Sequence, residues 1–317
     1  MEAQHQYHQE KYRFIILILY ILGALVNSLP VHTFSSINVL IENKFHISSI
    51  EVTLNALLFT IAHPLLSVPC NWLINRFGMH ISFVAACLLV SGGAWLRLLL
   101  EDGQSLYCLL GSFLAAIGNI FILNTPSKVA LNWFSKDRAG LVTFSGILAS
   151  MFSITLGASA PGLLIDEHTT NEDIKQFLFY EALVITVPLL FLAIFFREKP
   201  SQPPSKAARQ VFDQERGQYR DLLKKLFSNP QYLKLMAAMT FNYGTLTALI
   251  LILDQLLAGL GFSDSGHMTS ITVGSAMIIG IFSNPIFSYL LNSTKAYRAV
   301  AALSTFILIQ LLLEVFS

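Results

Sequence analysis

Residues 14–26 read FIILILYILGALV, a run without a single charged side chain. It lies inside a longer apolar stretch, Arg13–Leu40. A helix rises about 1.5 Å per residue, so about 20 such residues cross the roughly 30 Å hydrocarbon core of a bilayer. Eight more stretches of this kind follow, at Ile50–Ile74, Met79–Leu100, Ser105–Ala130, Ala139–Ile165, Gln176–Phe196, Tyr232–Leu260, Met268–Leu291 and Ala296–Phe316. The sequence therefore predicts an all-α protein that crosses a membrane nine times.

Composition points to the same class. Hydrophobic residues make up 54% of the 317 residues and charged residues 12%, with a mean hydropathy of +0.60. These charges are too few to cover a soluble globule, so we expect the lipid bilayer to be the solvent for most of the surface. A net charge of +1 gives no argument for a nucleic-acid partner.

No motif for an enzyme, a cofactor or a metal ion stands out. The sequence has no Gly-rich phosphate loop, no HExxH pair and no nucleophile elbow. Cys70, Cys87 and Cys108 fall in or beside predicted spans without metal-ligand spacing, so we expect small buried side chains there. We therefore expect neither catalysis nor a bound cofactor.

The basic residues predict the orientation. With the N-terminus in the cytoplasm, only Lys44, Arg97 and Lys175 fall on the outer side, and the other 17 of the 20 Lys and Arg residues fall on the inner side. Loops rich in Lys and Arg stay cytoplasmic. The chain is therefore predicted to be a multi-pass protein of the plasma membrane or an organelle membrane with a cytoplasmic N-terminus.

The predicted spans fall into a group of six and a group of three. We expect a cytoplasmic N-terminus at 1–12, a six-helix bundle at 13–196, a cytoplasmic linker at 197–231 and a partial bundle of three helices at 232–317. The linker has an extended, Pro-containing start and continues into a charged helical stretch near 206–216. Within the fifth span, small residues at 157–162 predict a close approach of two helices.

Two cytoplasmic turns resemble the loop signature of the major facilitator superfamily. Residues 71–78 read NWLINRFG, and residues 289–298 read YLLNSTKAYR. In the signature an Asp precedes the Arg, whereas Asn75 precedes Arg76 and Gly78 here, and the second turn offers Asn292, Lys295 and Arg298. The resemblance implies that these turns lock two halves together, with a weaker lock where Asn replaces Asp.

A narrower resemblance is carried by residues 93–97, GAWLR, and by residues 119–134, NIFILNTPSKVALNWF. Together with the 292–298 turn, these segments resemble the feline leukaemia virus subgroup C receptor-related transporters, which are linked to choline, ethanolamine and haem. The resemblance implies a substrate site in which Asn119 stands where the family has Gln. It also places Val31 where the family has a Trp of an aromatic cage, a few residues after Asn27.

Several polar or aromatic side chains could face a central cavity. The candidates for substrate binding are Asn27, His63, Asn119, Asn124, Phe241 and Tyr243. His63 lies near the middle of its span, where an ionisable group suggests a functional site, although a neutral His bonded to a neighbouring helix is the alternative. Glu181 and Asp254 lie nearer the outer ends of their spans, where we expect solvation at the interface.

These observations predict a transporter of the major facilitator fold with about nine of its 12 helices. We expect it to move a small organic solute, such as a choline-like amine, haem or a related metabolite, by alternating access. Three further spans would complete the second half, so we expect the 317-residue chain not to transport by itself. The alternatives are a transport-inactive homologue acting as a subunit or regulator of a membrane complex, or a chain whose bundle a second chain completes.

Overall fold

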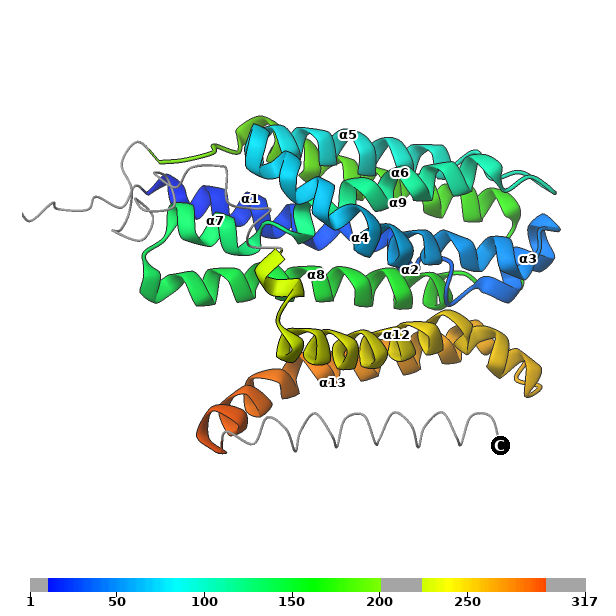
Figure 1. Cartoon of the computed structure of the whole chain (residues 1–317). Helices are drawn as coiled ribbons and strands as arrows, with labels where there is room; N and C mark the ends of the chain where they lie inside the picture. The colour runs from blue at the N-terminus through cyan, green and yellow to red at the C-terminus, as the bar shows by residue number, and fades with distance from the viewer. Residues whose placement is uncertain (1–10, 201–223, 295–317) are drawn as a thin grey trace, which may run out of the picture.

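The computed structural model describes residues 11–200 and 224–294, and the described residues fold into helices that run roughly side by side (Figure 1). In chain order the helices are α1 (Tyr12–Asn27), α2 (Leu29–His32), α3 (Asn38–Phe45), α4 (Ser49–Phe77), α5 (Met79–Arg97), α6 (Leu106–Leu123), α7 (Pro126–Trp133), α8 (Lys136–Leu164), α9 (Asn171–Phe195), α12 (Pro230–Gly259) and α13 (Ser265–Thr294). We call the end of the molecule where α1 starts and α9 ends the linker side, and the opposite end the distal side.

Eight of the nine predicted spans are confirmed as helices long and apolar enough to cross a membrane. The ninth, Ala296–Phe316, and the predicted helical stretch of the linker lie outside the described residues. The structure adds a feature that the span prediction did not address, because the helix is broken within the first and the fourth spans. The first breaks at Ser28, before Pro30, and the fourth breaks before Pro126, which begins α7. Proline lacks the N–H that continues a helix and suits its first turn, which accounts for both breaks.

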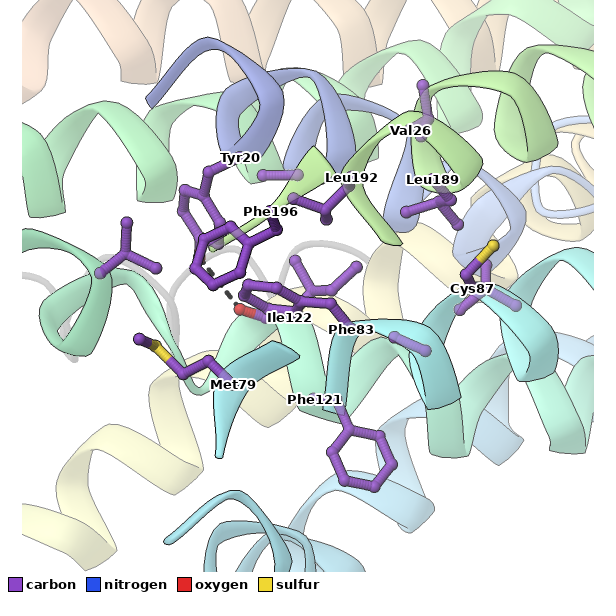
Figure 2. Packing of buried hydrophobic residues seen from close by; sticks show 14 of the residues in the cluster. Tyr20, Val26, Met79, Phe83, Cys87, Phe121, Ile122, Leu189, Leu192 and Phe196 are labelled. Atoms are coloured by element: carbon purple, nitrogen blue, oxygen red, sulfur yellow. Dashed lines mark hydrogen bonds between the residues drawn. The ribbon is translucent and has the colours of Figure 1, made fainter. Parts of the chain in front are cut away.

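The core of the first bundle forms around α1. Tyr20, at 1% exposure, lies beside Phe83 of α5, and its hydroxyl donates a hydrogen bond of 3.0 Å to the Ile122 carbonyl of α6 (Figure 2). Phe83 meets Phe196 edge to face, with ring centroids 4.6 Å apart. The Ile122 carbonyl lies at the end of α6, just before the break in the fourth span, so the Tyr20 hydroxyl supplies a hydrogen-bond donor where the helix ends. Aromatic packing and this hydrogen bond fix α1 against three neighbouring helices.

Small residues let α8 approach its neighbours, as the sequence predicted. A Cβ added at Gly157 would strike the Leu29 carbonyl of α2, and one added at Gly162 would strike the Gly266 carbonyl of α13. By contrast, an added Cβ at Gly140 on the linker-side end of α8 would meet nothing within 4 Å. Helix α8 is therefore packed closely at its distal half.

The pair α12–α13 touches the first bundle mainly on the distal side. Gly266 lies against the Ser36 carbonyl, 2.7 Å from where its Cβ would stand, and Thr155 of α8 contacts Met277 of α13. Towards the linker side, the side chains of residues 233–241 of α12 are all exposed. The linker-side end of α13 turns away from α8 in Figure 1. The described structure is thus closed distally and more open on the linker side.

We predict opposite effects of one substitution at two glycines of α8. Gly157→Ala should destabilise the protein by about 1–3 kcal/mol, because the methyl group meets the Leu29 carbonyl and overpacks the contact. Gly140→Ala has open space and should be neutral or stabilising by up to about 1 kcal/mol, since Ala is the better helix former. Thermal unfolding of the two purified variants would measure this. Equal melting temperatures would contradict the close approach of α2 to α8.

Candidate functional site

The break in the first span is held by side chains of two other spans. The Asn119 amide Nδ2 of α6 donates to the Asn27 carbonyl at 3.1 Å and to the Ser28 hydroxyl at 3.1 Å. In return, the Asn27 amide donates to the Asn119 carbonyl at 3.3 Å. The Ser28 backbone N–H donates to the Ser153 hydroxyl of α8 at 3.1 Å. Backbone groups that the break frees inside the bilayer thus find partners within the protein.

One polar atom at this break has no partner. The Asn27 side-chain oxygen Oδ1 is buried and accepts no hydrogen bond from any of the described residues, and Asn27 as a whole is 0% exposed. Leaving a buried acceptor unsatisfied costs about 1–3 kcal/mol. Asn119 lies near the middle of the span Leu106–Trp133, so this acceptor lies near mid-depth. A donor supplied by a ligand, or a rearrangement of the break, would relieve the cost.

The structure brings together two of the six predicted substrate-binding residues. Asn27 and Asn119 face each other, whereas Asn124 bonds to the Ser67 hydroxyl of α4 at 3.0 Å. His63 is half-buried on α4. Phe241 and Tyr243 are 51% and 64% exposed on α12, and within the described residues neither ring pairs with another aromatic ring. A common site for all six stays a prediction.

At the first of the two turns, Asn75 and Arg76 each contact a further side chain. Lys128 donates to the Asn75 oxygen at 2.8 Å, so a neutral side chain accepts from a cation here. Arg76 lies over the Trp72 ring, 5.8 Å from its centroid. Asn292 lies near the end of α13, and Lys295 and Arg298 lie outside the described residues. The role of the two turns as a lock therefore stays a prediction.

Gly78 makes room for a carboxylate in this turn. Its φ of +92° suits glycine, and a Cβ would come within 3.0 Å of the Glu198 carboxylate. Glu198 accepts a hydrogen bond of 2.9 Å from the His80 backbone N–H in the first turn of α5. Helix N-termini favour negative charge, so Glu198 anchors the chain after α9 to the start of α5. Glu198 lies 120 residues after Gly78, so the sequence alone gave no sign that the two residues are in contact.

Two acidic residues near the distal ends are buried, so the expectation that they are solvated at the interface was wrong. Asp254 is 1% exposed, and the Glu181 side chain is 9% exposed. Glu181 lies 3.6 Å from Arg97, which is 1% exposed and stacks on the Phe34 ring at 4.6 Å. Glu181 also accepts a hydrogen bond of 2.5 Å from the Thr33 hydroxyl. Residues far apart in sequence supply these contacts, which span-by-span inspection could not find.

These features define a class: a polytopic α-helical membrane protein with a broken first span and a second group of helices that closes on the first at one side. The chain belongs to the Major Facilitator Superfamily, which it matches over residues 16–317.

The matched relatives are also transporters by name. The chain is 24% identical over 295 residues to the choline/ethanolamine transporter FLVCR1 of Felis catus, covering 90% of the chain and 52% of that protein. It is 24% identical over 294 residues to the choline/ethanolamine transporter flvcr2a of Danio rerio, covering 90% and 62%. An uncharacterized MFS-type transporter of Caenorhabditis elegans is 23% identical over 309 residues, covering 94% and 52%. The resemblance carried by residues 93–97 and 119–134 is thereby confirmed, and the chain spans about half the length of most of these relatives.

We predict that Arg97 and Glu181 are coupled. Glu181→Met alone leaves the buried Arg97 guanidinium without a countercharge and should cost about 3–5 kcal/mol of stability, as should Arg97→Met for the opposite reason. The double variant removes both charges and should cost much less than the sum. A double-mutant cycle of unfolding free energies measures the coupling. Additive losses would show that the pair does not interact.

Proposed function

We propose that the chain serves to transport a small organic solute across a membrane by alternating access, with the solute held at the break in the first span. The carrying observation is the unpartnered Asn27 oxygen at mid-depth, beside Ser28 and Asn119. Transporters of this class bind their solutes near the bilayer midplane, often where a helix is interrupted. The relatives' names and the superfamily membership support the same function.

The chemistry of the break favours an amine that can donate hydrogen bonds. The Asn27 oxygen accepts but cannot donate, so a primary ammonium suits it, whereas a quaternary ammonium has no N–H to give. A quaternary ammonium is instead held by aromatic rings, and Val31 is a half-buried aliphatic residue. Phe241 and Tyr243 lie two positions apart on α12 and therefore point to different faces, so at most one of them can line a wall opposite the break. We therefore propose a small primary amine such as ethanolamine in preference to choline or haem.

The asymmetry between the two sides supports alternating access. The distal ends of α12 and α13 contact the first bundle, while the side chains of residues 233–241, towards the linker side of α12, are all exposed. This is the arrangement expected when a central site opens to the linker side. The complementary state would open distally as the two groups of helices rock.

We predict that Asn119 is needed for amine binding. Asn119→Leu removes two hydrogen bonds that hold the break and should abolish saturable binding, with a stability loss of about 1–3 kcal/mol. Asn119→Gln keeps the amide, so binding should survive. Ser153→Ala is the matched control, because it loosens the same break from α8 without touching the Asn pair.

Calorimetric titration of the purified chain in nanodiscs with ethanolamine and with choline would measure these effects. Tighter binding of ethanolamine by the unsubstituted chain would support the proposed preference. Unchanged binding by Asn119→Leu would remove Asn119 from the site. Absence of binding to any amine would favour the alternative of a transport-inactive subunit.

We also propose that the linker side is cytoplasmic, because 17 of the 20 Lys and Arg residues then lie inside. Single cysteines introduced in the linker and at 166–173 would report this with a membrane-impermeant maleimide on intact cells. The native cysteines are buried and should give little background. Labelling at 166–173 alone is expected, and labelling of the linker from outside would reverse the orientation.

A further inference from the structure

Three hydrogen bonds join α12–α13 to the first bundle within the described residues. The Asp254 oxygen Oδ2 accepts from the Val39 backbone N–H at 2.9 Å. The Gln255 amide donates to the Thr53 hydroxyl of α4 at 3.2 Å, and the Thr155 hydroxyl donates to the Met277 sulfur at 3.2 Å. The first involves a full charge, and hydrogen bonds to charged groups are about twice as strong as neutral ones. Of these three links, the one made by Asp254 is therefore the strongest.

Asp254 lies between the starts of two helices. Val39 is the second residue of α3, and Ser265, the first residue of α13, donates its hydroxyl to the Asp254 oxygen Oδ1 at 2.6 Å. The first N–H groups of a helix lack intrahelical partners and attract negative charge. One carboxylate thus accepts a hydrogen bond from a free N–H at the start of α3 and also fixes the turn between α12 and α13.

The receiving end of this contact is itself held in place. The Asn38 side chain, at the first residue of α3, donates to the Thr53 hydroxyl at 3.0 Å and accepts from the Ser49 hydroxyl at 3.0 Å. Thr53 is also the residue that Gln255 contacts. The start of α3 is therefore fixed to α4, so the contact with Asp254 joins α12 to the first bundle and not to a loose segment.

Because Asp254 is buried, its charge depends on the hydrogen-bond donors around it. The residue is 1% exposed, and none of the described basic residues forms an ion pair with it. Its charge is thus stabilised by Val39 and Ser265 as donors. Separating α12 from α3 removes the Val39 donor, but it also opens the carboxylate further to the hollow that it already lines. That hollow has a volume of about 290 Å³ and is lined by Asp254 together with Lys44, Asp166, Glu167, Asp264 and His267. Water can therefore replace the lost donor, so the contact can be made and broken.

We propose that Asp254 is the latch of the distal gate: its carboxylate, seated on the start of α3, holds α12–α13 against the first bundle and keeps the distal side closed. The proposal rests on alternating access, since a latch has meaning only if the distal side opens. It assigns a conformational role to a residue outside the break in the first span.

Labelling of a cysteine at the gate tests the latch. Ser270 of α13 is 1% exposed and lies against Gly162 of α8, and its hydroxyl has no hydrogen-bond partner in the described part of the chain. Ser270→Cys, in a chain whose native cysteines are replaced by serine, is reconstituted in liposomes and treated with a membrane-impermeant maleimide. Asp254→Ala should raise the labelling rate by roughly tenfold or more, because it removes charged hydrogen bonds at the gate. Asp254→Asn keeps one acceptor and should raise it less.

Two controls make the result decisive. Asp264→Asn changes a carboxylate lining the same hollow, but the Asp264 side chain is 72% exposed, so the labelling rate should not change. In a parallel chain that retains only Cys108, which is 1% exposed inside the first bundle, labelling should stay slow in Asp254→Ala.

An unchanged rate at Ser270→Cys in Asp254→Ala would overturn the latch, as would an equal rise in Asp264→Asn or at Cys108. The labelling needs no solute. A chain that bound no amine would refute the proposed substrate and still leave the latch to be judged by its own result.

Discussion

A lipid bilayer offers no hydrogen bonds, so every backbone N–H and C=O inside it must find a partner within the protein. This demand is sharpest at Ser28, where the first span breaks. The break is tolerated because Asn119 and Ser153, from two other spans, supply the missing partners. The same side chains tie α1 to α6 and α8. The interruption therefore fixes the relative position of three helices and also places an unpartnered acceptor near mid-depth.

The buried acids at the distal end are stabilised in two different ways. Glu181 has a cation, Arg97, and both belong to the first bundle, so that pair can stay intact in any arrangement of the two groups of helices. Asp254 has only neutral donors, and one of them, Val39, belongs to the other group. A charge paired within one rigid unit contributes to its structure, whereas a charge shared between two units depends on their relative position. This difference is why we assign a switching role to Asp254 alone.

On the linker side, the superfamily's turn is built here with different chemistry. Asn75 accepts a hydrogen bond from Lys128, and the acidic side chain in the turn comes from Glu198, beyond the end of α9. Gly78 admits that carboxylate because it has no Cβ and adopts a positive φ. Both Glu198 and the helix start that it contacts belong to the first bundle. The contact therefore fixes the chain that leaves α9 for the linker.

The sequence by itself determined the class and most of the spans, because a run of about 20 apolar residues without charges is typical of a transmembrane helix. It also identified the superfamily and the close packing of residues 157–162, since small side chains and local motifs are visible in one dimension. Sequence reasoning placed Asn27 and Asn119 among the candidates, but their mutual contact joins residues 92 positions apart. The burial of Asp254 and Glu181 likewise could not be foreseen, because a position near the end of a span does not reveal what packs over it. Only the tertiary structure decided these points, since partners such as Arg97, Val39 and Glu198 come from other helices and are brought there by the packing of the whole bundle.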